Sequence, residues 1–364
     1  MILCVAGLLV NLAVADSISS QNLQNNANFE SLAINSEVNL QDKKFMLKQT
    51  NQNSQKETKN ESLANQNLLS ELDTQTLKEL EKYDRNLHNT PKTEQEKAEL
   101  EKLIEAITNA DYNKTKEILD NNPNLINLNL RPFYNPTSAY FYSIMKFSDK
   151  DLELKFSFQS DEYVKERKEK IQAITKGKVF DEKIFNLLMS YKPKLYTNDL
   201  LPFMVVMNES IDDNKTAEIM QIMFDDGMSA NLQYFTTPKQ LAEVAFDVDK
   251  FNTTELLLKY NKDERICLSL QMSSGMQVGM FFFDRDLSLF ANKNEPLNDK
   301  QIALANSSEF LSLKNRQLDF VEKIIKNYCD KDLSGLVSYE MTLKRLGDNE
   351  NMERLRKLGY KDRK

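Results

Sequence analysis

The residue types that most often carry chemistry are sparse in this sequence. His88 is the only histidine in 364 residues, and it lies in a polar stretch shortly before Pro91. Catalysis by a serine or cysteine nucleophile needs an imidazole held beside the nucleophile, and zinc sites commonly combine several His or Cys ligands. One histidine in polar surroundings supplies neither arrangement. We therefore expect His88 to be a surface residue, and we predict no catalytic residues and no metal centre.

Acidic residues offer a second kind of chemistry, and Asp284 and Asp286 come closest to a cation site. Arg285 stands between them and no third ligand is near, which favours a charged turn over a divalent-cation site. A carboxylate pair that hydrolyses glycosidic bonds stays open in a chain with 55 acidic residues, although no pair stands out. The sequence has no glycine-rich phosphate loop, and we predict no cofactor.

Three cysteines bear on covalent structure. Cys4 belongs to an N-terminal apolar run, which leaves Cys267 and Cys329 in the rest of the chain. In an oxidising compartment these two residues could form one disulfide bond. Both lie in segments with helical periodicity, where cysteine also packs as a small apolar residue. The sequence leaves both alternatives open.

Two copies of the pattern Asp-x-Asn-x-Thr offer sites for covalent modification. They centre on Asn113 and Asn214. Asn-x-Thr is the acceptor pattern for N-linked glycans, and the added acid is similar to the extended acceptor motif of bacterial N-glycosylation in the Campylobacter group. Asp and Asn also cap helices and form turns without any sugar. Glycosylation and capping are therefore two alternative predictions for these motifs.

The N-terminal residues predict export. Residues 2–15 form an apolar run that ends in Ala-Val-Ala, the order of a secretory h-region and its cleavage site, although no Lys or Arg precedes the run. We expect a signal peptide over residues 1–15 and a periplasmic or secreted protein after its removal. The run is too short to cross a bilayer, and no later stretch is apolar enough, so no stable membrane span is expected after cleavage.

Composition divides the remaining chain into a polar segment and a folded segment. Residues 16–66 are rich in Asn, Gln and Ser and can bury too little to offset their ordering entropy, so we predict a disordered tether there. Over residues 67–364 apolar residues recur at helical spacing, with Lys and Glu on the opposite faces. The net charge of −7 includes no basic stripe, which argues against nucleic-acid binding. The folded segment is expected to be mainly α-helical.

An alternation of helix, stop and helix runs through the folded segment. Apolar pairs that end helices recur at one or two multiples of roughly 33 residues. These pairs are Ile118-Leu119, Leu187-Leu188, Met223-Phe224, Leu257-Leu258, Ile324-Ile325 and the half-polar Lys357-Leu358. In the clearest unit Gly227 ends one helix, and Thr237 and Pro238 begin the next.

This unit, from Met223 to Asp263, resembles an ankyrin repeat. Its first part stands where that family has Leu-Leu-x-x-Gly-Ala-Asp-x-Asn, and Thr237-Pro238-x-x-Leu241-Ala242 matches Thr-Pro-Leu-His-x-Ala, with Gln240 in place of the His. With the predicted signal peptide and the two Asp-x-Asn-x-Thr motifs, the chain resembles an exported, Campylobacter-like bacterial member of that family. The resemblance also implies an all-α, ankyrin-like α-solenoid of about five or six degenerate repeats.

Two gaps of double length interrupt the repeat period. The sequences near 148–180 and 272–299 alternate apolar and polar residues or carry glycines within apolar runs, which predicts two strand-like insertions. Insertions in a solenoid emerge on one face, and that face is often used for binding. We therefore expect specificity to reside in these two segments.

The resemblance implies a function in protein recognition, because stacked helix pairs expose an extended surface that needs no chemistry. We expect a periplasmic scaffold that binds another protein of the cell envelope and is not an enzyme. Aromatic residues in turns are the predicted anchors, although each could instead bury against a neighbouring repeat. These anchors are Tyr134, Tyr196, Tyr234 and Phe235. Two alternatives are a carboxylate-dependent hydrolase of wall glycans with its site in the insertions, and a secreted effector that binds a host protein.

Overall fold

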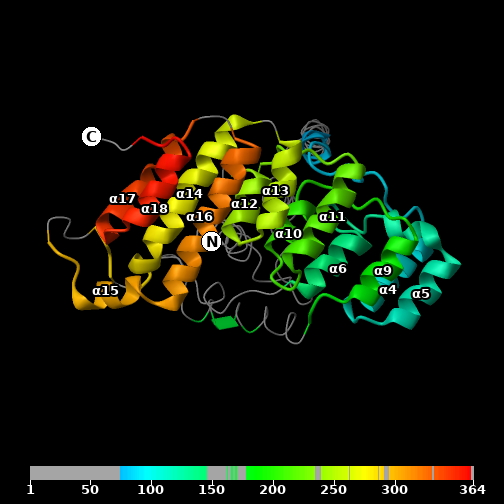
Figure 1. The fold of residues 1–364 in the computed structure, drawn as a ribbon. Helices are drawn as coiled ribbons and strands as arrows, with labels where there is room; N and C mark the ends of the chain where they lie inside the picture. The colour runs from blue at the N-terminus through cyan, green and yellow to red at the C-terminus, as the bar shows by residue number, and fades with distance from the viewer. Residues whose placement is uncertain are drawn as a thin grey trace, which may run out of the picture. The chain divides into compact units, whose positions relative to one another are not determined.

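The structure is a computed structural model of the chain (Figure 1). It describes residues 74–145, 178–233, 239–261, 263–285, 287–290, 295–329 and 332–361, and the isolated residues 162, 165, 166 and 169. These residues are mostly helical and include isolated β-bridges but no sheet, which confirms an all-α fold. They form two compact units. Residues up to 228 belong to the first unit, and residues 229–233 and those from 239 onward belong to the second.

The first unit is built from short helices in neighbouring pairs (Figure 1). In chain order they are α4 (Glu94–Thr108), α5 (Tyr112–Asn121), η1 (Pro123–Asn127), α6 (Pro136–Ile144), α9 (Glu182–Ser190), α10 (Leu201–Met207) and α11 (Asp213–Asp225). Helix α4 packs against both α5 and α6, α5 also contacts α9, and α10 contacts α6 and α11. An aromatic cluster lies between α6 and α9. It consists of Tyr140, Phe141, Phe180 and Phe185.

The second unit is organised around one long helix. Its elements are α12 (Leu241–Asp247), α13 (Phe251–Tyr260), α14 (Glu264–Phe283), α15 (Asp299–Ala305), α16 (Ser308–Asn327), η2 (Ser334–Leu336), α17 (Val337–Leu346) and α18 (Asn349–Lys357). Helix α14 packs against α12, α16, η2 and α17, while α13 packs on α12 and α18 on α17. The second unit has a core to which α14 contributes the buried residues Val278, Phe281 and Phe282. Residues of α16, α17 and α18 complete this core.

Three of the helix pairs turn through the same backbone corner. Ala110, Asp249 and Gly347 have left-handed φ angles of 55°, 59° and 69°. In each corner the next residue donates its backbone N–H over 2.9 Å to the carbonyl five residues earlier. These bonds run from Asp111 to Ala106, from Lys250 to Ala245 and from Asp348 to Leu343. A left-handed residue satisfies free carbonyls at a helix end and turns the chain. The pairs α4–α5, α12–α13 and α17–α18 therefore share this corner.

The predicted strand-like insertion near 272–299 is wrong over its first part, because residues up to Phe283 belong to α14. Helix α14 carries apolar residues on its exposed side as well as on its buried side, so it lacks a clear amphipathic period. Its Val and Phe residues also favour strands when they are judged without their neighbours. The insertion predicted near 148–180 lies almost entirely outside the described residues.

Glycines bring α14 close to η2 and α17. A Cβ added to Gly275 would lie 2.7 Å from the Cβ of Ser338 and 2.7 Å from the backbone nitrogen of Tyr339. A Cβ on Gly335 would lie equally close to Gln271. Such distances leave no room for a side chain, so these glycines serve close packing.

Candidate functional site

The predicted aromatic anchors do not form one exposed surface. The side chain of Tyr196 is only 3% exposed, its hydroxyl donates to Asp199, and the Arg85 guanidinium lies 4.1 Å from its ring centroid. Burial, together with the hydrogen bond to Asp199, raises the pKa of the Tyr196 hydroxyl. Tyr196 therefore packs inside the first unit, which is the alternative that the sequence left open, and it offers almost no surface to a partner.

The other predicted anchors give no more support to an aromatic surface. Tyr134 is half-buried, and the Arg131 guanidinium lies 4.5 Å from its ring centroid. Tyr234 and Phe235 lie outside the described residues. Of the four predicted anchors, the structure therefore describes two, and of these only Tyr134 is partly exposed.

The residues considered for catalysis or metal binding belong to different units of the structure or lie outside the described residues. His88 is exposed, as predicted, and its Nε2 lies 2.8 Å from Oε1 of Glu81. Asp284 is the exposed residue that ends α14, and Asp286 lies outside the described residues. Among the residues with a described position, no group of three or more His, Cys, Asp or Glu side chains could hold a metal ion.

The structure decides between the two alternatives for the cysteines. Cys267 near the start of α14 forms a disulfide with Cys329, which follows the end of α16. Their Cα atoms lie 5.6 Å apart although the residues are 62 positions apart in the chain. The bond therefore joins the two long helices of the second unit covalently.

The two Asp-x-Asn-x-Thr motifs adopt the same geometry at the starts of α5 and α11. Asp111 and Asp212 are the caps, and each accepts a backbone N–H over 2.9 Å. Asn113 and Asn214 are exposed in the first helical turn. The threonines at the fourth helical position are fully buried. Both acids thus serve as helix caps, and a glycan on either asparagine stays a prediction.

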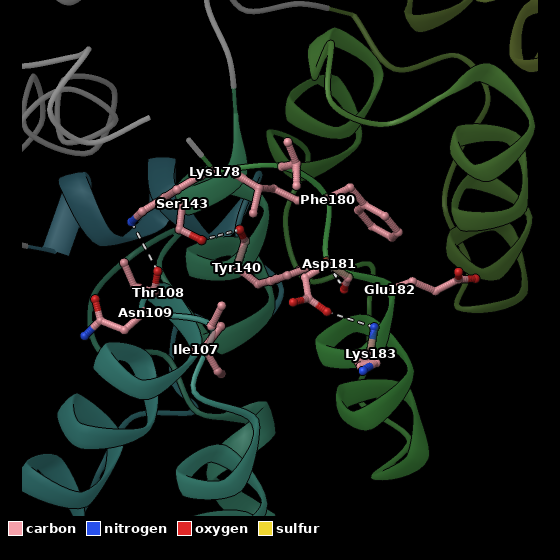
Figure 2. Close-up of a pocket in the computed structure, with 13 residues that line it drawn as sticks. Ile107, Thr108, Asn109, Tyr140, Ser143, Lys178, Phe180, Asp181, Glu182 and Lys183 are labelled. Atoms are coloured by element: carbon pink, nitrogen blue, oxygen red, sulfur yellow. Dashed lines mark hydrogen bonds between the residues drawn. The ribbon is translucent and has the colours of Figure 1, made fainter. Parts of the chain in front are cut away.

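A pocket of about 680 Å³ in the first unit lies between the end of α4, α6 and the segment before α9 (Figure 2). Lys178 Nζ donates to the Thr108 carbonyl over 3.1 Å, and burial lowers the pKa of this lysine. The Tyr140 hydroxyl donates to the Asp181 carbonyl over 2.7 Å, and Ser143 Oγ donates to the carbonyl of Tyr140. These groups bond to one another within the fold, so they do not converge on a ligand position in the pocket.

The clearest candidate site is an exposed apolar face on α14 in the second unit. Met272, Met276, Met280 and Phe283 are 41%, 55%, 41% and 60% exposed. Their spacing of three or four residues places them on one side of the helix. Over residues 266–283, α14 carries no charged side chain. We refer to these four residues as the methionine face.

Helices α12 and α17 border the methionine face. On one side Ser269 Oγ donates to Glu243 of α12. On the other side Gly275 packs against Ser338 of α17. At 100° per residue, Met272, Met276 and Phe283 fall between these two contacts. The exposed strip is about 16 Å long, which corresponds to three helical turns.

Sequence reasoning directed attention to this segment but missed the face itself. The signal was present as three methionines at positions i, i+4 and i+8 within an uncharged run. That spacing marks one side of a helix, and it was hidden by the interpretation of the segment as a strand-like insertion.

Comparisons of the chain with protein-family models, with curated proteins and with solved structures find no match. Among the residues that the structure describes, α14 is the one helix long and apolar enough to cross a membrane, so the expectation that no stretch after the N-terminal run is apolar enough is wrong for this helix, half of which is buried. Core helices of water-soluble domains meet the same criteria, and the packing of α14 on α12, α16 and α17 is that of such a core helix.

Proposed function

We propose that the chain is an exported, ankyrin-type scaffold that binds another protein of the cell envelope. One observation carries the proposal, namely the corner that the pairs α4–α5, α12–α13 and α17–α18 have in common. Recurrence of one two-helix unit along a chain is the basis of repeat proteins, in which each unit buries its apolar side against the next. The ankyrin-like motifs between Met223 and Asp263 agree with such a unit.

Packing within each unit supports a stack of such modules. In the first unit α6 lies against the first helix of the α4–α5 pair. In the second unit α14 lies between α12 and α17, which are the first helices of two pairs of the common kind. First helices that pack side by side expose one continuous side of the stack. A solenoid of about five or six modules is the arrangement we propose for the whole repeat region.

Two observations support the envelope as the location. The apolar N-terminal run predicts export. The disulfide between Cys267 and Cys329 suits an oxidising compartment, since cytosolic thiols are kept reduced. Protein recognition in the periplasm is therefore the function that we propose, with the methionine face as an exposed apolar surface among the described residues.

Fractionation followed by capture tests this function. A C-terminally tagged full-length chain, expressed in its native cells, is expected in the osmotic-shock fraction. Gentle crosslinking there should enrich a specific envelope protein over a control in which residues 1–15 export the tag alone. Retention in the cytosol would contradict export, and recovery of no partner after crosslinking would contradict the scaffold. Accumulation in the culture supernatant would instead favour the secreted effector.

A further inference from the structure

We infer that Asn113 and Asn214 are glycosylated while the chain is unfolded, and that the formation of α5 and α11 then closes both acceptor motifs. The inference rests on the proposed export of the chain and adds a covalent modification and the state in which it occurs. Three observations carry it: the helical conformation of both motifs, the burial of both threonines, and the unpaired hydroxyl of Thr115.

Transfer of an N-linked glycan requires two side chains of the motif in one active site. The amide nitrogen of asparagine forms a bond to the first sugar of an oligosaccharide that a lipid diphosphate carries. The bond between that sugar and the diphosphate breaks, and the amide gives up one proton to the solvent. A transferase that selects Asn-x-Thr must contact the threonine side chain at the same time. The motif is therefore a substrate only where one surface presents both side chains.

The helical conformation separates these two side chains. Asn113 and Thr115 lie within α5. Asn214 and Thr216 occupy the same positions in α11. Residues two positions apart point about 200° apart around a helix, whereas they share one face of an extended segment. Both asparagines are exposed and both threonines are fully buried, so a transferase cannot contact both side chains of either motif in the folded chain.

The first turns of both helices are stabilised by residues of the motif itself. Asp111 accepts the backbone N–H of Lys114 over 2.9 Å, and the Lys114 ammonium lies 3.0 Å from a carboxylate oxygen of Glu117. The same cap and the same ion pair recur in α11, over 2.9 and 2.6 Å. Opening either motif costs the free energy of these bonds, which keeps it closed after folding.

The hydroxyl of Thr115 has no role in the fold that would explain its presence. It is fully buried, and its Oγ has no hydrogen-bond partner in the part of the chain that the structure describes. Burying an unpaired hydroxyl is unfavourable, and valine would fill the same space without that cost. Recognition of Asn-x-Thr, by contrast, requires the hydroxyl. Thr216 differs, since its hydroxyl donates to the Asp212 carbonyl over 2.8 Å.

A glycan attached before folding is compatible with the finished fold. Asn113 and Asn214 are exposed, so the sugar extends into solvent while α5 and α11 form. Folding then leaves the glycan in place and closes the motif to any further transfer.

In vitro transfer tests the inference on folded and unfolded acceptors. The acceptors are the purified full-length chain, a peptide of residues 106–120 and a peptide of residues 207–221. Each is incubated with an oligosaccharyltransferase that recognises the motif and with its lipid-linked donor. Peptides of this length form little helix in water, so we expect each peptide to be glycosylated at least about tenfold faster than the same site in the folded chain. Mass spectrometry measures the rates.

Proline substitutions open one helix at a time in the full-length chain. Proline removes a helical N–H and clashes with the carbonyl four residues earlier. That carbonyl belongs to Asn113 for Glu117→Pro and to Asn214 for Glu218→Pro. Each variant should be glycosylated at its own motif at least about tenfold faster than the parent. Glu117→Ala and Glu218→Ala remove the same carboxylates but keep a good helix former, so these matched controls should react as slowly as the parent.

Thr115→Val separates recognition from folding. In the peptide it should abolish transfer to Asn113. In the full-length chain it should leave the midpoint of thermal unfolding unchanged or raise it, because it removes an unpaired buried hydroxyl. A lower midpoint would assign the threonine to the fold and count against the inference.

Mass spectrometry of the exported chain from native cells should find a glycan on both asparagines. Absence of the glycan from the exported chain, transfer to the folded chain at the rate of the peptides, or no transfer to the peptides would overturn the inference. The purified system depends neither on export nor on a partner. Retention of the chain in the cytosol, or failure to capture a partner, would therefore reject the proposed function and leave the in vitro result standing.

Discussion

Helices α14 and α16 belong to the same unit and have 20 residues each, yet they expose opposite kinds of surface. The exposed side of α16 carries charges that pair with neighbouring segments, such as Arg316 with Asp249 in the α12–α13 corner and Lys323 with Glu255 of α13. Over residues 266–283 the exposed side of α14 carries Met and Phe and no charge. A helix whose outer side only meets water is expected to be amphipathic, as α16 is. An exposed apolar side on α14 therefore points to contact with something other than water.

The comparison also separates stability from recognition. Buried residues of α14 such as Ser274 and Val278 hold the helix in the core of the unit, whereas the methionine face contributes little to folding because it stays exposed. Changes on the buried side should therefore destabilise the unit. Changes on the methionine face should leave it folded and affect binding.

Loss of the disulfide that joins the two helices has the largest expected effect. Cys267→Ser combined with Cys329→Ser should lower the free energy of unfolding of the second unit by about 4 kcal/mol, because a loop of 62 residues is then no longer closed in the unfolded chain. Denaturant unfolding of the full chain measures the change. The parent chain in excess reductant should match the double variant, and an unchanged midpoint after complete reduction would contradict the prediction.

Overpacking the buried side of α14 comes next. Gly275→Ala should lower the free energy of unfolding by about 3 kcal/mol, because its Cβ would lie 2.7 Å from backbone and side-chain atoms of α17. Gly279→Ala is the matched control and should cost about 1 kcal/mol or less, since its Cβ would lie 3.3 Å from the Thr342 hydroxyl and 3.9 Å from a ring carbon of Phe290. Alanine is the better helix former, so a gain in stability at position 275 would contradict the close packing.

An ion pair of α16 gives a pH-dependent test. Burial opposes the charge of Asp348, but hydrogen bonds from Lys314 and Asn351 outweigh it and hold the pKa of this carboxyl below its usual value. Stability from this group is therefore present above the unfolded-state pKa of about 3.9, and it is lost as the pH falls through the lower folded-state pKa.

Asp348→Asn keeps an N-cap side chain but leaves the largely buried Lys314 ammonium without its partner. It should lower the free energy of unfolding by about 2 kcal/mol at pH 7 and reduce its dependence on pH below 4. Chemical unfolding across this pH range is the measurement. An identical acid profile for both proteins would contradict a role for this pair.

Single lysine substitutions on the exposed sides should have the smallest effect on folding. Met276→Lys on α14 and Asn315→Lys on α16 should each change the free energy of unfolding by less than about 0.5 kcal/mol, because both positions face solvent. Thermal unfolding under the same conditions compares them directly. A large loss of stability in the Met276→Lys protein alone would mean that the methionine face belongs to the core.

Much of the local structure could be predicted from sequence, because helix ends depend on neighbouring residues. Asp111 and Asp212 lie at helix starts and cap them, and Gly227 and Gly359 end helices in left-handed conformations. The all-α class followed from the helical spacing of apolar residues. These features require no knowledge of distant parts of the chain.

The candidate site and its setting were decided by tertiary packing. Pairing of Cys267 with Cys329 depends on where two segments far apart in the chain meet, and burial of Tyr196 depends on Asp199 and Arg85 around its ring. In α14 the same apolar residues are compatible with a strand, a fully buried helix or an exposed recognition face. Contacts with α12 and α17 decide which sides are covered, because burial is a property of neighbours that local sequence does not contain.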